Sequence, residues 1–228
     1  MSPQAETLTN VPMFRSLARP AVKALDARCK WRQVAARQWV IDYQDEGLDV
    51  FFVVSGSVRA LIYAKSGREV ILADIEAGGF FGEMASIDGH SRSASVLAIS
   101  DAVVATMPGG VFLEVLQEHP AVSMYVLKLL AARVRELDNR VLEYSTFDVG
   151  HRVACELLRL ARPDPKSARR GILSPPPTQA EIAARVSSHR EYVAREMKSL
   201  ERDGFLQREH NAIILTNMPG LVQRLENE

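Results

Sequence analysis

The sequence predicts an α+β protein in which a β-rich domain is followed by a long helix and then by a small helical domain that ends in a hairpin. Three observations support this order. Short β-type runs broken by glycines fill residues 39–107, no glycine occurs in residues 111–149, and helical patterning returns at Thr178 after a proline-rich segment. With 228 residues, of which 47% are hydrophobic and 25% charged, the chain has material for one large domain or two modest ones.

The β-rich domain is predicted from five runs with glycines between or beside them. Regularly spaced short strands with turn signals are typical of a small β-barrel or sandwich. The segment before them, residues 13–37, is partly helical in pattern and is expected to pack against the barrel. The five runs are Val50–Val54, Ser57–Tyr63, Glu69–Ile75, Ser95–Ile99 and Ala102–Met107.

A long helix is predicted after Gly110, with an apolar stripe at alternating steps of three and four residues. This is the a/d pattern of a coiled coil, sustained for about three heptads. Such a narrow stripe fits a partner helix better than a broad core, so we favour a homodimer seam over a helix that lies on its own barrel. The stripe consists of Leu127, Leu130, Val134, Leu137, Val141 and Tyr144.

The last third of the chain begins with a proline-rich connection at residues 162–177, which no helix can cross. Two capping-box patterns then predict two helix starts, one at Thr178–Glu181 and one at Ser188–Glu191. The second helix is expected to bury Val193, Met197 and Leu200 and to stop at Gly204, and a hairpin around His210 follows. Residues 151–228 hold 13 basic and 10 acidic residues, a net charge of +3, although the whole chain is neutral.

Composition excludes several classes of protein. No apolar run approaches the roughly 20 residues that span a bilayer, and Met1–Phe14 has no hydrophobic signal core, so we expect a soluble, cytoplasmic protein. Cys29 and Cys155 are too far apart for a metal-ligand pair and are expected to be reduced and buried. The five histidines form no metal-ligand pattern, which disfavours a cupin-type metalloenzyme, and a haem or iron–sulfur sensor lacks its ligands. We therefore expect no metal and no catalysis.

Residues 78–96 hold the features of an anion site. Glycines allow backbone N–H groups to approach a ligand, and a short helix starting near Glu83 would direct its positive end at an anion. Arg92 can offer a two-pronged donor to phosphate oxygens and Ser93 a hydroxyl, whereas the Glu83 carboxylate more plausibly accepts from a sugar hydroxyl.

This stretch resembles the phosphate cassette of the cyclic-nucleotide-binding domain. Two blocks carry the resemblance, Phe81-Gly82-Glu83-Met84-Ala85 and Arg92-Ser93-Ala94-Ser95-Val96, at the spacing usual in that family. The resemblance implies that Gly82 and Ser93 present donors, that Glu83 holds the ribose 2′-hydroxyl and that Arg92 binds the cyclic phosphate.

The base contact departs from the family pattern. In the bacterial cyclic AMP receptor family the long helix carries an arginine near the ribose carboxylate, matched here by Arg133, and two hydroxyl residues that meet adenine. Those two positions are Leu137 and Asp138. Leu137 can neither donate nor accept, whereas Asp138 can accept from the adenine amino group or from two N–H groups of guanine. We expect cyclic AMP as the ligand, with cyclic GMP as an alternative, and a solvated Asp138 beside the seam remains equally possible at this point.

The second predicted helix of the last third also resembles this family. Arg190-Glu191-x-Val193-x-Arg195 is similar to its recognition helix, after a Thr-x-x-Glu-Ile-Ala helix and before a winged hairpin. Basic side chains with one acid suit the major groove, where Arg reads guanine and Glu can accept from cytosine. The candidate DNA-binding residues are Thr178, Gln179, Ser188, His189, Arg190, Glu191, Arg195, Lys198, Arg202 and His210.

Resemblance thus extends from about Phe14 to Leu225. It implies a β-roll of the double-stranded β-helix or jelly-roll type at 1–110, a dimerisation helix at 111–147 and a winged helix-turn-helix at 148–228. The implied function is a bacterial homodimeric transcription regulator that responds to a cyclic nucleotide, binds a two-fold symmetric TGTGA-like DNA site and contacts RNA polymerase. The same fold with a different anion or a redox signal is the alternative.

Overall fold

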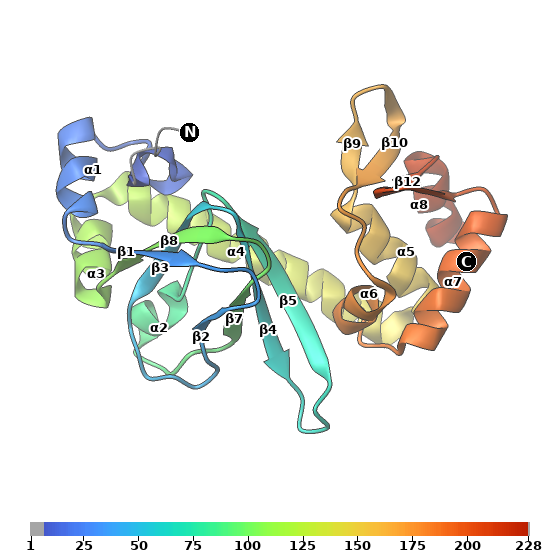
Figure 1. The fold of residues 1–228 in the computed structure, drawn as a ribbon, viewed down its shortest axis with the longest axis horizontal. Coiled ribbons are helices and arrows are strands. Elements are labelled where there is room, and N and C mark those ends of the chain that lie inside the picture. The colour runs from blue at the N-terminus through green and yellow to red at the C-terminus, as the bar shows by residue number, and fades with distance from the viewer. Residues whose placement is uncertain (1–6, 228) are drawn as a thin grey trace. The chain divides into compact units, whose positions relative to one another are not determined.

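The computed structural model describes residues 7–227, so the expectation about a signal segment at residues 1–14 falls partly outside it. The chain divides into two compact units, and the division falls between Val134 and Arg135, within one long helix. Each unit mixes strands and helices, and the predicted α+β architecture is confirmed (Figure 1). The predicted domain boundaries, after residues 110 and 147, stay predictions.

The first unit contains two four-stranded antiparallel sheets, with strand orders β1-β8-β3-β6 and β2-β7-β4-β5. All five predicted runs are strands. The hairpin β4–β5 carries a cross-strand ion pair in which Arg59 Nε lies 2.6 Å from Asp74 Oδ1. The strands are β1 Lys30–Val34, β2 Trp39–Ile41, β3 Val50–Ser55, β4 Ser57–Tyr63, β5 Glu69–Glu76, β6 Phe80–Phe81, β7 Ser95–Ala98 and β8 Ala102–Met107.

The continuous apolar run of β3 is explained by cover on both of its faces. Side chains of a strand alternate between two faces. Phe51 and Val53 join the core that also takes Val58 and Val96 from the other sheet, whereas Val50 and Phe52 join a second core beneath the helices. The unit is therefore a two-sheet structure with helices packed on one sheet.

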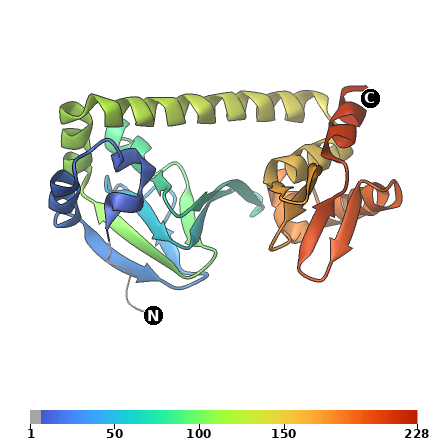
Figure 2. The same ribbon diagram turned by 90° about the horizontal axis from the view of Figure 1, so that it is seen from above.

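The helical part of this unit is only partly as expected. Two short 3-10 turns, Leu8–Asn10 and Pro12–Phe14, and α1 (Arg19–Asp26) precede the strands, as the pattern of residues 13–37 suggested. The single long helix predicted after Gly110 is two helices, α3 (Gly109–Glu118) and α4 (Pro120–Thr146). His119 interrupts them because Pro120 has no N–H to continue the hydrogen-bond ladder and suits a first helical position. Figure 2 shows α4 as one uninterrupted helix.

The second unit packs helices against the sheet β11-β12-β10-β9. Its centre is an apolar cluster that contains Leu157, Ile182, Val193, Met197 and Leu215, all fully or almost fully buried. The predicted connection at 162–177 is not a plain loop, because β9 and β10 pair within it and β10 pairs with β12. The elements are α5 Val149–Leu160, β9 Arg162–Asp164, β10 Ser167–Leu173, α6 Gln179–Arg185, α7 Arg190–Arg202, β11 Leu206–Glu209, β12 Ala212–Leu215 and α8 Met218–Asn227.

Candidate functional site: a phosphate cassette and a helix-turn-helix

The cassette turn joins β6 to α2 (Glu83–Asp88) through Gly82, which has a φ of +83°. A Cβ at this position would lie 2.6 Å from Arg92 Nη1 and 2.9 Å from the carbonyl oxygen of Asp49. Both the left-handed conformation and the lack of space therefore require glycine. The turn holds the backbone of Gly82 directly against the Arg92 guanidinium.

Arg92 lies inside the protein, with only 3% of its surface exposed. Its Nη1 donates to the carbonyl oxygen of Gly82 at 2.9 Å and its Nη2 to that of Asp49 at 2.8 Å. The guanidinium also lies over the Phe51 ring, 5.5 Å from its centroid. Within residues 7–227, Arg92 Nε has no hydrogen-bond partner, so this buried cation still has a donor to offer. Burial lowers the pKa of Arg92, and nearby carboxylates, Asp45 first, oppose that effect.

Glu83, the first residue of α2, is 2% exposed and forms an ion pair with Arg133 of α4. Arg133 Nη1 donates to Glu83 Oε1, and Nη2 donates to the carbonyl oxygen of Phe80 at 3.3 Å. The pair connects the cassette to α4 across fifty residues of sequence. The structure thus brings together four of the predicted ligand residues, Gly82, Glu83, Arg92 and Arg133.

The other predicted ligand residues differ in exposure. Phe81, Ala85 and Ala94 are buried, whereas Met84 and Ser93 are exposed. Leu137 is 57% exposed and Asp138 is also exposed, one helical turn beyond Arg133 on α4. Leu137 and Asp138 belong to the second unit and the cassette to the first, and their role as base contacts stays a prediction.

The predicted seam on α4 is an exposed apolar stripe in the single chain. Leu127, Val134, Leu137 and Val141 are each more than half exposed, and only Val122 and Val126 near the start of α4 are buried. Apolar side chains at a/d positions of a long helix are stabilised when a second helix covers them. This exposure favours the homodimer seam over a helix that lies on its own barrel.

The first capping box of the second unit is confirmed, and the second is wrong. Thr178 Oγ1 accepts from the Glu181 N–H, and Glu181 in turn accepts from the Thr178 N–H. The N-cap of α7 is His189, without a side-chain cap, because the backbone N–H of the buried Ser188 donates to the Ala183 carbonyl instead. Ser187 has a φ of +51° and turns the chain there.

The outer face of α7 carries charged side chains, while Val193, Met197 and Leu200 are buried as predicted. Arg190, Glu191, Arg195, Lys198 and Arg202 are all exposed. Arg195 is restrained by Glu196 at 3.1 Å and by the Tyr192 ring, whose centroid lies 5.1 Å from the guanidinium. Around α7, His189 and His210 are exposed. This face can present donors to DNA without rearrangement of the core.

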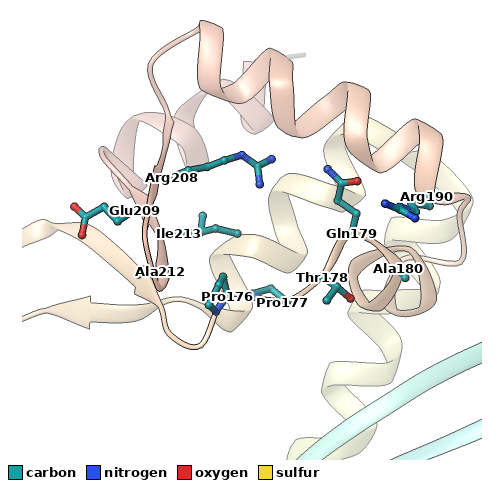
Figure 3. Close-up of a pocket in the computed structure, with 10 residues that line it drawn as sticks. All are labelled: Pro176, Pro177, Thr178, Gln179, Ala180, Arg190, Arg208, Glu209, Ala212 and Ile213. Atoms are coloured by element: carbon teal, nitrogen blue, oxygen red, sulfur yellow. The ribbon is translucent and has the colours of Figure 1, made fainter.

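A groove of roughly 690 Å³ lies between the start of α6 and the β11–β12 hairpin (Figure 3). Thr178 and Gln179 line one side, Arg208 and Ile213 the other, and Arg190 of α7 stands at one end. Arg208 and Tyr192 were not predicted from the sequence as DNA-binding residues. In the sequence, Arg208 is only an arginine in a predicted hairpin strand, and Tyr192 is only an aromatic residue three positions before Arg195. Neither pattern is specific for DNA binding.

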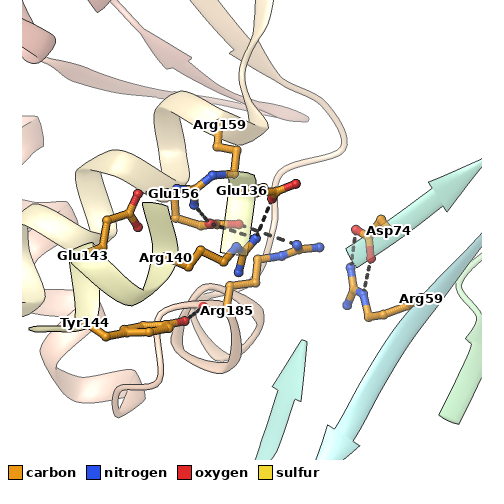
Figure 4. Close-up of polar contacts among 9 residues, drawn as sticks. All are labelled: Arg59, Asp74, Glu136, Arg140, Glu143, Tyr144, Glu156, Arg159 and Arg185. Atoms are coloured by element: carbon orange, nitrogen blue, oxygen red, sulfur yellow. Dashed lines mark hydrogen bonds and ion pairs between the residues drawn. The ribbon is translucent and has the colours of Figure 1, made fainter. Parts of the chain in front are cut away.

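A buried carboxylate, Glu156 of α5, ties three helices of the second unit together (Figure 4). Glu156 Oε2 accepts from Arg159, and two further ion pairs reach it, from Arg185 of α6 at 3.6 Å and from Arg140 of α4 at 3.8 Å. Tyr144 Oη donates to the Arg185 carbonyl at 2.8 Å. The last turns of α4 are thereby fixed to the helix-turn-helix.

Known protein families match both the part of the chain that holds the cassette and the part that holds the helix-turn-helix. The cyclic nucleotide-binding domain family matches residues 31–119, and the Crp-like helix-turn-helix domain family matches residues 151–224. The cAMP-activated global transcriptional regulator Vfr of Pseudomonas aeruginosa is 33% identical over 195 residues, which cover 82% of this chain and 91% of Vfr. The chain belongs to the cyclic AMP receptor family of transcription regulators.

A second relative agrees with this assignment, and a solved structure shares the fold. The cAMP-activated global transcriptional regulator CRP of Salmonella typhimurium is 28% identical over 198 residues, which cover 86% of this chain and 94% of that protein. Among solved structures, a CooA mutant from Carboxydothermus hydrogenoformans has a TM-score of 0.79 at 20% identity, with 95% of this chain and 96% of the other covered. As a member of this family, the chain is a cyclic-nucleotide-responsive transcription regulator that binds DNA through its helix-turn-helix and acts as a dimer.

Three further observations concern metal ligands, membrane-spanning helices and the cysteines. In residues 7–227, no group of three or more His, Cys, Asp or Glu side chains could hold a metal ion. Across the same described part of the chain, no helix has the length and apolar character needed to cross a membrane. Cys29 and Cys155 are free and half-buried, and burial raises the pKa of the Cys29 thiol to about 12.

Proposed function

We propose that the ligand is cyclic AMP, with cyclic GMP as the alternative, and that it binds in the cassette. The observation that carries this proposal is the pair of buried charged groups, Arg92 and Glu83, which lie nine residues apart in sequence and on either side of the Gly82 backbone. A buried guanidinium with an unused Nε–H suits a phosphate anion. Glu83 Oε1 is taken by Arg133, so Oε2 is available to accept from the ribose 2′-hydroxyl.

In this proposal the remaining cassette residues shape the site. The Gly82 backbone and the exposed Ser93 hydroxyl donate to the phosphate. Phe81, Met84, Ala85 and Ala94 form the surroundings of the ribose and phosphate. The ligand then contacts α4 through Arg133, and this contact shifts a pre-existing equilibrium between dimer arrangements.

Asp138 is proposed to read the base, with Leu137 beside it as an apolar contact. A carboxylate can accept from two N–H groups of guanine but from only one amino group of adenine. Calorimetric titration of the wild type and of Asp138→Ala with each nucleotide tests this. We expect the variant to lose more affinity for cyclic GMP than for cyclic AMP, and an equal loss for both, or none, would contradict the assignment.

For DNA, we propose an inverted repeat with TGTGA-like half-sites. Arg190 and Arg195 contact guanines, and Glu191 contacts a cytosine of the complementary strand. Lys198 and Arg202 lie further along α7 and contact phosphates, as do four residues at the edges of this face, Thr178, Gln179, His189 and His210. Ser188 is buried and supports the turn that precedes α7. Both half-sites can be engaged only when the two recognition helices lie about one DNA turn, roughly 34 Å, apart.

We infer that the protein acts only by binding cyclic nucleotide and DNA and catalyses no reaction. It works in the bacterial cytoplasm, where bound DNA and RNA polymerase are both accessible to it. The experiment that tests the ligand is a calorimetric titration of the full-length protein with cyclic AMP and with cyclic GMP. Binding of at least one nucleotide supports the proposal, and no heat with either nucleotide would contradict it.

A further inference from the structure

We propose that Tyr192 of α7 positions the Arg195 guanidinium before DNA is bound, and that it thereby sets the selectivity at the base pair that Arg195 contacts. The proposal rests on the DNA recognition proposed above and adds a positioning residue to it. Tyr192 acts through Arg195 and does not itself contact a base.

Tyr192 is an exposed aromatic residue on the charged face of α7. Its side chain is 46% exposed, whereas the next residue, Val193, is fully buried in the apolar cluster of the second unit. Arg195 follows three positions later, so the two side chains are neighbours on the same helix surface. The Tyr192 ring is therefore placed to act on a surface neighbour, and the core does not depend on it.

The ring lies against the Arg195 guanidinium, whose central carbon is 5.1 Å from the ring centroid. The arginine side chain nevertheless remains 68% exposed. A guanidinium attracted to an aromatic face keeps its N–H donors in its own plane, where they can still bind an acceptor. The contact therefore restrains the orientation of Arg195 and leaves its donors accessible to DNA.

A carboxylate provides a second restraint on Arg195. Arg195 Nε donates to Glu196 Oε1 at 3.1 Å. The other oxygen of Glu196 lies beside the first turn of α5, because a Cβ added at Gly150 would be only 3.0 Å from Glu196 Oε2. Glycine thus leaves the space for this carboxylate, and the positive end of α5 stabilises its charge. Arg195 is restrained by the Tyr192 ring and, at Nε, by a carboxylate next to α5.

Such restraint matters most for reading a base. Guanine offers O6 and N7 to two donors of one arginine, so the contact requires a defined orientation of the guanidinium. Immobilising a long side chain on binding costs conformational entropy, and a side chain that is already oriented loses less. Without the ring, Arg195 keeps its charge and its general attraction to DNA but loses part of its orientation. Loss of Tyr192 should therefore reduce selectivity at one base pair.

The test is a comparison of Tyr192→Leu, Tyr192→Phe and Arg195→Ala, each in the full-length protein with saturating cyclic AMP. Fluorescence anisotropy measures affinity for a TGTGA-like inverted repeat and for operators substituted symmetrically at one position in both half-sites. Tyr192→Leu is also combined with Arg195→Ala. Its combination with Lys198→Ala is the matched control, because Lys198 is an exposed cation further along the same helix. Thermal unfolding verifies that each variant is folded.

Tyr192→Leu is expected to reduce selectivity at the base pair that Arg195→Ala identifies, while selectivity at the other positions is retained. An exposed cation–π contact corresponds to about two- to fivefold per half-site, or about four- to 25-fold for a dimer on two half-sites. Tyr192→Phe should stay within about twofold of the wild type because it keeps the ring. Tyr192→Leu should have its full effect in the Lys198→Ala background and none in the Arg195→Ala background.

Two results would overturn the positioning role alone. One is unchanged selectivity in Tyr192→Leu although Arg195→Ala relaxes it. The other is an equal loss from Tyr192→Leu with and without Arg195, which would mean that the ring contacts DNA directly. If Arg195→Ala instead weakens every operator alike, Arg195 reads no base, and the proposed base contact fails together with the role of Tyr192.

Discussion

Within residues 7–227, each of the two units buries one glutamate, and the surroundings of the two glutamates differ. Glu83 faces one arginine, Arg133, which is itself 36% exposed and approaches from α4. Glu156 is reached by three arginines from three helices, and Arg185 among them is only 4% exposed. Both carboxylates are almost completely buried, at 2% and 1% exposure.

Because of this difference, Glu83 has room for a further hydrogen-bond partner, whereas Glu156 is already surrounded by arginines of the fold. A buried charge is costly unless it is paired, and loss of a partner leaves the remaining charge uncompensated. Glu83 lies beside a glycine turn and a buried cation, and we propose that its second oxygen accepts from the ligand. Glu156 already pairs with three arginines of the protein, and these ion pairs link α4, α5 and α6.

The largest effect is expected from Glu156→Ala. This variant should lower the free energy of unfolding by about 3–5 kcal/mol, because it leaves buried arginines without their carboxylate. The measurement is chemical denaturation of the full chain. Glu136→Ala is the matched control, since Glu136 is half-exposed and pairs with the same Arg140, and it should cost about 0–1 kcal/mol. If both variants lowered the free energy of unfolding by the same amount, the buried ion pairs of Glu156 would contribute no more than the exposed pair of Glu136.

Arg92→Ala should act on ligand binding. It removes the only cation between Gly82 and Val96, and a lost charge-assisted contact should cost about 2–4 kcal/mol, or roughly 30- to 1000-fold in nucleotide affinity. Calorimetry measures this directly. Binding within threefold of the wild type would show that the phosphate is held elsewhere.

The exposed cations of α7 provide the next contrast, because one is proposed to read a base and another a phosphate. Arg190→Ala should cost about 1–3 kcal/mol per half-site and relax selectivity at one base pair. Arg202→Ala should weaken all operators alike and flatten the salt dependence. The two variants are compared on matched and singly substituted operators at fixed salt. A uniform loss for both would mean that α7 anchors to the backbone without reading bases.

The smallest effect concerns an exposed carboxylate, Asp148, which caps α5 by accepting from the His151 N–H at 2.9 Å. This hydrogen bond holds the pKa of Asp148 below its ordinary value of 3.8. A lowered folded-state pKa stabilises the fold above the unfolded-state pKa, and the contribution is lost as pH falls through the folded-state value. Asp148→Ala should therefore cost about 0.5–1 kcal/mol at neutral pH and less in acid below about pH 4. A cost that stays constant down to pH 2 would contradict this role.

The sequence was sufficient for the features that depend on neighbouring residues. The cassette lies within sixteen residues from Phe81 to Val96, so its glycine turn, acid and arginine could be recognised together. The five apolar strands and the Thr178 capping box were also predicted from short-range patterns. Arg133 was placed through the family resemblance, and its contact with Glu83 fits that placement.

Other features were missed because their signals are weak or distant. The strand β1 is mostly polar and lies at a sheet edge, and β9 and β10 lie in a segment where prolines and arginines obscure the strand pattern. Ser188 matched a capping box, yet the turn at Ser187 uses the Ser188 N–H in another hydrogen bond. The partners of Glu156 come from different helices, and each alone has the pattern of a solvated charge.

Ligand bound in the cassette is expected to promote operator binding, and one comparison tests this coupling directly. Affinity for a TGTGA-like inverted repeat is measured at fixed salt for the wild type and Arg92→Ala, each with and without cyclic nucleotide. Coupling between two sites is typically about 1–3 kcal/mol, so the wild type should gain about 5- to 150-fold with nucleotide. Arg92→Ala should gain nothing at the same concentration. Equal wild-type affinity with and without either nucleotide would contradict the account.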